Sequence, residues 1–261
     1  MHVFRLAFQG HRFAGTALQP GQRTVQGRLR EILAQLDDGR EVLTRTCGRL
    51  DAGVGAEQLV LHAHVTREWD CVALAKAING HLQGEAQVVA AASMPDDWDA
   101  LSEPSTKTYR YTILQREVGP DPDAALWHHR RLDHTHLLPA MARSMVGRHD
   151  LSAFAALRND ESDLADGTRD YLAADWRARP APGAGTLWQF RITGTGFLYR
   201  QVRGLVGAQI AVARGKATLE QFLAAIDAGR DYPRVGQVAP AEGLVLEAVS
   251  YQREPEWQSV R

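Results

Sequence analysis

Two segments that alternate apolar and polar residues constrain the fold of this chain most. Residues 3–9 and residues 107–114 both show this pattern, which is typical of β-strands. Helical periodicity and further alternating segments follow each of them. We therefore predict an α+β protein of two halves side by side, residues 1–103 and residues 104–261.

The first half contains predicted strands and helices in a mixed order: strands at 3–9, 58–65 and 88–93, a helix that follows the N-cap residue Thr24, and a helix at 71–82. The second half has the same mixture: strands at 107–114, 169–177, 187–193 and 245–251, and helices at 137–145, at 198–210 and after Thr218. The crevice between two such halves is a natural place for a site.

Composition places the chain among ordinary globular proteins. Of its 261 residues, 44% are hydrophobic and 23% are charged, and no run of about 18 apolar residues could span a membrane. The first residues lack the pattern of a signal peptide, and two cysteines form no disulfide framework. We expect a cytoplasmic protein with no membrane partner.

The net charge of the chain does not indicate a nucleic-acid partner, but one segment of the chain is locally basic. The net charge is −1. Residues 191–219 nevertheless contain no Asp or Glu and carry five positive charges, on Arg191, Arg200, Arg203, Arg214 and Lys216. Such a basic strip could hold a phosphate backbone, although codon bias explains the abundance of arginine better.

The segment RLDAGVG at 49–55 is the most informative one for chemistry. Its carboxylate, Asp51, stands between Arg49 and Gly53, and alternation puts Arg49 and Asp51 on the same side of an extended segment. A loop aspartate that caps a turn remains the alternative. No dinucleotide or Walker fingerprint is present, because the third glycine is missing and a strand follows. No set of His, Cys and carboxylate residues has metal-ligand spacing, so no metal site is predicted.

Six segments resemble, in order, the motifs of TruA-type tRNA pseudouridine synthases. They are RTVQG (23–27), GRLDAGV (48–54), KTYRY (107–111), GRHDLSAF (147–154), GFLYRQVR (196–203) and APAEGL (239–244). Together they span nearly the whole chain. Several independent matches in order are far more specific than any one of them alone.

The resemblance implies isomerisation of uridine to pseudouridine at positions 38, 39 and 40 of the tRNA anticodon stem-loop. It also implies two α+β halves that form a continuous antiparallel sheet, with helices packed on it and a central RNA-binding cleft. Family members are homodimers and need neither a metal nor an organic cofactor.

The resemblance also assigns roles to four residues. Asp51, in the first half, falls on the catalytic aspartate. In the second half, Tyr109 falls on the tyrosine that stacks against the target base and Arg203 on the arginine that pairs with the aspartate. Arg49 falls on an arginine that helps to fill the space left by the flipped nucleotide. Whether Asp51 attacks C1′ or removes the C2′ proton stays open.

Some positions depart from the family pattern. Leu50 and Gly55 stand where threonine and histidine are usual, Gln201 replaces a common methionine, and Leu101 and Ser102 replace an arginine and an aromatic residue. These losses leave two alternatives open: a divergent member that acts on other RNA uridines, and a non-catalytic RNA-binding protein. A carboxylate hydrolase would need a second acid opposite Asp51, and no residue can be assigned to it.

Overall fold

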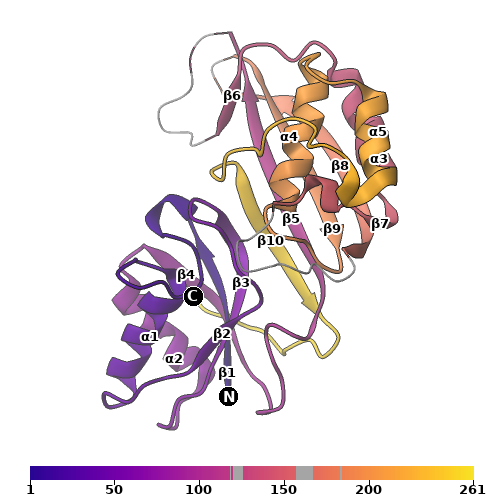
Figure 1. The fold of residues 1–261 in the computed structure, drawn as a ribbon. Coiled ribbons are helices and arrows are strands. Elements are labelled where there is room, and N and C mark those ends of the chain that lie inside the picture. Colours follow the sequence, from indigo (N-terminus) through magenta and orange to yellow (C-terminus); the bar gives the residue numbers. More distant parts are fainter. Residues whose placement is uncertain (118, 120–125, 157–166, 183) are drawn as a thin grey trace. The chain divides into compact units, whose positions relative to one another are not determined.

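The computed structural model describes residues 1–261 except 118, 120–125, 157–166 and 183. The chain forms two compact units. The first contains Met1–Lys107 and Val245–Arg261, and the second contains Thr108–Leu244. The C-terminal segment thus returns to the first unit (Figure 1).

The first unit is an antiparallel sheet with two helices. Its strands are β1 (His2–Phe8), β2 (Thr44–Thr46), β3 (Gly55–Ala63), β4 (Ala86–Ser93), β10 (Leu244–Tyr251) and β11 (Gln258–Ser259), and its helices are α1 (Val25–Leu36) and α2 (Cys71–Leu82). The hydrogen-bonded order is β11-β4-β1-β3-β10, and β2 pairs with β3. All of these pairs are antiparallel except β3 with β10.

Local capping explains where the two helices of the first unit begin. The Thr24 side chain accepts a hydrogen bond from the Gly27 amide at 3.2 Å, and the Asp70 carboxylate accepts bonds from the first turn of α2. The two helices contact each other (Figure 1). Each has a buried apolar stripe: Val25, Leu29, Ile32 and Leu33 on α1, and Leu74, Ala75, Ile78 and Leu82 on α2. Their burial forms the core of this unit together with the inner face of β1, β3 and β4.

The second unit has a smaller sheet and three α-helices. Its strands are β5 (Pro104–Gln115, which starts in the first unit), β6 (Trp127–His129), β7 (Gly147–Asp150), β8 (Thr168–Pro180) and β9 (Thr186–Gly194), and its helices are α3 (Leu138–Ser144), α4 (Gln201–Ala213) and α5 (Leu219–Ala228). The order is β5-β9-β8-β7, and β6 pairs with β5 in parallel. The pairs β7–β8 and β8–β9 are antiparallel.

Helix α4 is the central helix of the second unit, because nearly all of its residues are buried. It comes so close to its neighbours that a Cβ at Gly204 would clash with the Phe154 carbonyl, and one at Gly207 with the Gln237 carbonyl. Helical periodicity predicts its start at residue 198, but the helix begins at Gln201. The reason is the left-handed conformation of Arg200 (φ 56°), which ends the preceding turn. The capping box at Thr218 and Gln221 is confirmed.

The predicted class is confirmed: the chain is α+β, with a mostly antiparallel sheet and helices packed on it. The predicted division at residue 103 and the central cleft stay predictions. Among the described residues, no helix combines the length and the apolar character that crossing a membrane requires.

Candidate functional site

Asp51 lies in the loop that connects β2 to β3 in the first unit. The loop turns tightly, because the Val54 amide donates to the Asp51 carbonyl at 3.2 Å and Gly53 has a φ of 84°. Only glycine adopts this φ without strain. The side chain of Asp51 is half-buried, and Arg49, two residues earlier, is exposed. The tight turn therefore fixes the backbone from which the predicted catalytic carboxylate extends.

The buried residue Thr16 anchors this loop, which we call the Asp51 loop (residues 47–54). Thr16 is 0% exposed, and its hydroxyl accepts a hydrogen bond from the Leu50 amide at 2.8 Å. Its own amide donates to the Leu50 carbonyl at 3.2 Å. Both backbone groups of Leu50 are thus satisfied by one residue, and the position next to Asp51 is fixed.

Two glycines bring a second stretch of backbone against the Asp51 loop. A Cβ at Gly15, which has a φ of 97°, would lie 2.7 Å from the Leu50 carbonyl oxygen. A Cβ at Gly10 would clash with the Gly53 carbonyl. Neither contact tolerates a side chain, because the atoms that it would meet belong to the backbone.

Lys107 lies beside the start of the Asp51 loop. Its Nζ is 3.1 Å from the point where a Cβ on Gly48 would stand. Burial lowers the pKa of Lys107, and the neighbouring Cys47 partly offsets this. Burial likewise raises the pKa of the Cys47 thiol, which is fully buried. The half-buried Lys107 and the fully buried Cys47 thus lie at the start of the loop.

The departures from the family pattern have clear places in the first unit. Leu50 is buried, so its side chain belongs to the core and its backbone to the Thr16 contact. Gly55 opens β3, where a Cβ would come within 3.2 Å of the Phe8 carbonyl oxygen. The local backbone therefore leaves little room for a histidine at 55. Leu101 and Ser102 lie exposed on the surface.

Tyr109 lies on β5 and is held by an aromatic neighbour in the second unit. The ring of Phe197 meets it edge-on, with centroids 5.1 Å apart and planes at 87°. Phe197 in turn packs against Tyr171 at 5.8 Å. The preceding residue on β5, Thr108, hydrogen-bonds to Thr193 of β9 at 2.9 Å. The half-buried Tyr109 ring thus has its orientation set by Phe197.

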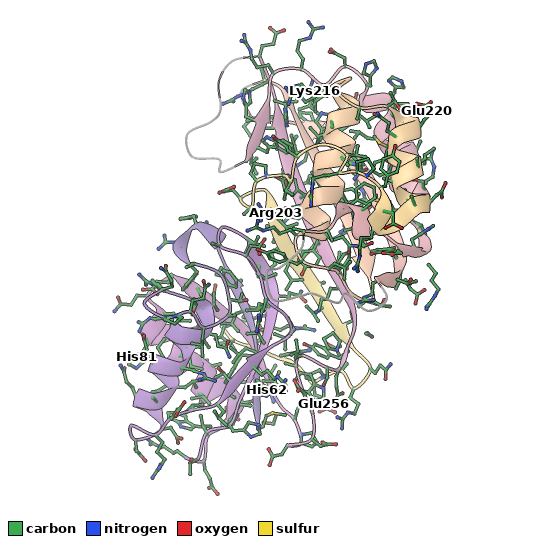
Figure 2. The ribbon with its side chains drawn as sticks, in the orientation of Figure 1. His62, His81, Arg203, Lys216, Glu220 and Glu256 are labelled. Carbon is green, nitrogen blue, oxygen red and sulfur yellow. The ribbon has the colours of Figure 1, made fainter. Side chains whose placement is uncertain are left out.

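Arg203 lies in the first turn of α4 (Figure 2) and is tied to the segment 239–243. Its Nε donates to the Ala239 carbonyl at 2.8 Å, while the Ala239 amide donates to the Arg203 carbonyl at 3.1 Å. Tyr111 of β5 contacts the same segment, because its hydroxyl donates to the Pro240 carbonyl at 2.8 Å. Burial raises the pKa of Tyr111, so its hydroxyl stays a donor at neutral pH.

Gln201, at the start of α4, organises the loop that carries Phe197. Its side-chain oxygen accepts bonds from the Tyr171 hydroxyl and the Leu198 amide, both at 3.1 Å, and its nitrogen donates to the Leu151 carbonyl at 3.0 Å. The residue is 0% exposed. It is therefore a buried polar group with every bond inside the protein. Figure 1 shows the end of α4 from which this network extends.

The four predicted site residues divide between the two units. The Asp51 loop supplies Asp51 and Arg49, while β5 and α4 supply Tyr109 and Arg203. The pairing of Asp51 with Arg203 and the roles of all four residues stay predictions. No cluster of three or more metal-ligating side chains is found within the described part of the chain.

Sequence reasoning missed the residues that hold the site residues in place: Thr16, Lys107, Phe197 and Gln201. Gln201 had a readable signal, because a glutamine on the apolar stripe of a predicted helix requires buried partners. Thr16 had none, because its contact with Leu50 joins residues that are distant in sequence and have no periodic relation.

Comparisons of the sequence with known proteins show which family the chain resembles. The sequence profile of a family described as tRNA pseudouridine synthase matches residues 141–252. The chain is 32% identical over 257 residues to tRNA pseudouridine synthase A of Cereibacter sphaeroides, covering 97% of this chain and 98% of the relative. It is 37% identical over 252 residues to that of Solidesulfovibrio magneticus, covering 94% and 89%. With such identity over nearly its full length, the chain belongs to the tRNA pseudouridine synthase A family.

Proposed function

We propose that this protein isomerises uridine to pseudouridine in tRNA, at positions 38, 39 and 40 of the anticodon stem-loop. The observation that supports this most is its similarity, over nearly the full length, to relatives named tRNA pseudouridine synthase A. The Asp51 loop adds to it, because a half-buried carboxylate stands on a backbone held by buried contacts.

The reaction exchanges one bond to the ribose for another. The N1–C1′ bond breaks, the uracil turns, and a C5–C1′ bond forms; C5 then loses its proton and N1 gains one, so substrate and product are isomers. A base inside a helix cannot be reached, so it must first be flipped out of the stack. We propose that Arg49, exposed beside Asp51, fills the space that the flipped nucleotide leaves.

Asp51 is the group that acts on the ribose in this proposal. Its carboxylate either attacks C1′ as a nucleophile or removes the C2′ proton as a base. Arg203 supplies the positive charge that keeps the carboxylate ionised and oriented. The double link between Arg203 and Ala239 limits the motion of that arginine, which supports a positioning role.

Tyr109 holds the target base in this proposal. Stacking of a base on an aromatic ring is worth about 1–3 kcal/mol. The perpendicular contact with Phe197 fixes the orientation of the Tyr109 ring before the RNA arrives, which lowers the entropy cost of stacking. The Tyr109 hydroxyl is also a candidate for removing the C5 proton. The enzyme acts, on this proposal, as a cytoplasmic homodimer without metal or organic cofactor.

The test is pseudouridine formation on an unmodified tRNA transcript, with wild type compared with Asp51→Asn. We expect wild type to modify positions 38 to 40 and the variant to bind the same RNA without modifying it. Activity that survives in the variant would show that another group does the chemistry. Binding without modification by the wild type, across a full tRNA pool, would favour a non-catalytic RNA-binding protein.

The same assay also tests which RNA uridines are the substrate. Leu101 and Ser102, both exposed, stand where an arginine and an aromatic residue are usual in the family. Such residues contact phosphate and bases, so their absence favours an altered choice of RNA. Modification mapped to uridines outside positions 38 to 40 would support a divergent family member that acts on other RNA uridines.

The proposed homodimer is tested separately, by size-exclusion chromatography with light scattering.

A further inference from the structure

A cavity of the second unit contains residues that the proposed chemistry does not use. It has a volume of about 740 Å³ and lies where β6, the segment that follows it and the end of α4 come together. Figure 2 labels Lys216, which lines it just beyond α4. Two of its lining residues, Arg214 and Lys216, belong to the basic strip that the sequence analysis singled out.

The lining of this cavity, which we call the β6 pocket, carries an excess of positive charge. Four of its residues are cations, Arg130, Arg131, Arg214 and Lys216, and two are carboxylates, Glu117 and Asp133. Arg131 and Asp133 form an ion pair with each other at 3.2 Å. All four cations are exposed to solvent, and the excess positive charge of the lining attracts a ligand that is itself anionic.

A buried and neutral imidazole forms part of the lining of the same pocket. His129 is 6% exposed, and its Nε2 has no hydrogen-bond partner among the described residues. Burial, followed by the nearby charge of Arg214, lowers the pKa of His129 to about 4, so the ring is neutral at physiological pH. The Nε2 atom is itself covered from solvent, so His129 adds a neutral ring to the lining of the pocket and no further positive charge.

An aromatic side chain completes the pocket. Trp127 is half-buried and its ring stands at 63° to that of His129, with centroids 4.4 Å apart. The Arg116 amide donates to the His129 carbonyl at 3.0 Å, and this bond anchors β6 to the backbone after β5. Cations that follow a phosphate backbone, with an aromatic ring beside them, are what proteins use to bind single-stranded nucleic acid.

We propose that the β6 pocket is a second RNA-binding site, in which Arg214 and Lys216 contact phosphate oxygens of the tRNA and Trp127 packs on an unpaired base or ribose. This inference rests on the proposed function, because it takes the substrate RNA as the occupant. The pocket contributes affinity and leaves the chemical step unchanged, since none of its residues belongs to the predicted catalytic set.

The test measures the Kd of the full-length protein for an unmodified tRNA transcript at several salt concentrations. The variant Arg214→Gln/Lys216→Gln removes two cations from exposed positions. We expect its Kd to rise about 10-fold and the slope of log K against log salt to fall by about 2. KM for the transcript should rise with it, while kcat at saturating tRNA stays at the wild-type value.

Two control variants separate the pocket from general charge effects. Arg143→Gln removes one exposed cation from α3, which packs on β8 and lies away from β6 (Figure 1), and it should bind as the wild type does. Arg214→Lys/Lys216→Arg keeps both charges and should keep the salt slope. A double glutamine variant with wild-type Kd and slope, or no weaker than Arg143→Gln, overturns the inference.

The same data distinguish this inference from the proposed function. If the wild type modifies tRNA while the double glutamine variant binds it equally well, the β6 pocket is not an RNA site and the enzyme assignment stands. If the wild type neither binds nor modifies tRNA, the proposed function is wrong, and so is the inference that the β6 pocket binds tRNA.

Discussion

In the Asp51 loop of the first unit the contacts hold the backbone, whereas in the second unit they hold the side chains of Tyr109 and Arg203. In the loop, Thr16 satisfies both backbone groups of Leu50, and glycines allow close approach of the chain. In the second unit, Phe197 orients the Tyr109 ring. The stability of the two regions should therefore respond to different substitutions. The first region should be sensitive to a Cβ added at its closely packed glycines, and the second to changes in side-chain shape and hydrogen bonding.

The largest effect is expected for Gly10→Ala, which breaks the backbone packing of the first region. The new Cβ would clash with the Gly53 carbonyl, and neither backbone can withdraw easily. We expect the free energy of unfolding to fall by about 3 kcal/mol, at the upper end for an overpacked site. Chemical denaturation measures it, and pseudouridine formation should fall with it.

Gly80→Ala is the matched control for this change. Gly80 lies in α2, and a Cβ there would have no atom within 4 Å. Alanine is a better helix former than glycine, so this variant should be more stable by about 0.5–1 kcal/mol. Equal effects of the two substitutions would show that close backbone packing does not hold the Asp51 loop.

The second prediction breaks the side-chain network of the second region. Gln201→Met places the usual family residue on α4 but leaves the Tyr171 hydroxyl and the Leu198 amide without their partner. We expect a loss of about 2 kcal/mol in the free energy of unfolding. Adding Tyr171→Phe to this variant removes one of the orphaned groups and should recover part of that loss. A double variant less stable than Gln201→Met contradicts this explanation.

The sequence predicted regular elements better than it predicted the contacts that position the site. Periodicity and capping residues located α1, α2 and α5, because these depend on neighbours within a few residues. The start of α4 was placed three residues early, because hydrophobic spacing does not reveal the left-handed conformation of Arg200.

The candidate site was predicted as a set of residues but not as a structure. The order of the motifs indicated Asp51 and Tyr109 as site residues. In the structure, Asp51 lies on the loop between β2 and β3, and Tyr109 lies on β5. Their supports, Thr16 and Phe197, act through distant pairs, and the sequence offers no periodic pattern for such contacts. These contacts depend on tertiary packing, which rules based on local sequence do not predict.

The third prediction sharpens the comparison at the level of activity. Phe197→Leu removes the edge-on contact with Tyr109 but keeps an apolar side chain. Such aromatic pairs are worth about 0.5–1.5 kcal/mol, so we expect kcat/KM for tRNA to fall about 2- to 10-fold. In a Tyr109→Leu background the same substitution should have little further effect. Independent, multiplicative losses would mean that Phe197 does not act through Tyr109.

The smallest effect concerns the buried amine under the Asp51 loop and appears as a pH dependence. Burial lowers the pKa of Lys107 below its ordinary 10.5, so below the lowered pKa the folded protein carries an unfavourable buried cation. This cost disappears as the pH rises towards 10.5, where the unfolded chain also loses its proton. The stability of the wild type should therefore rise relative to Lys107→Met over this range.

The neighbouring thiol reinforces the sign of this difference. Burial raises the pKa of Cys47 above its ordinary 9.0, so this group reduces stability as the pH rises through that value. Lys107 lowers the pKa of Cys47 in part, and its removal makes the alkaline loss larger in the variant. Unfolding measured from pH 7 to 10.5 tests this, with Lys76→Met on the exposed side of α2 as the control. A difference that changes no more with pH than the control would show that the burial of Lys107 does not affect stability over this range.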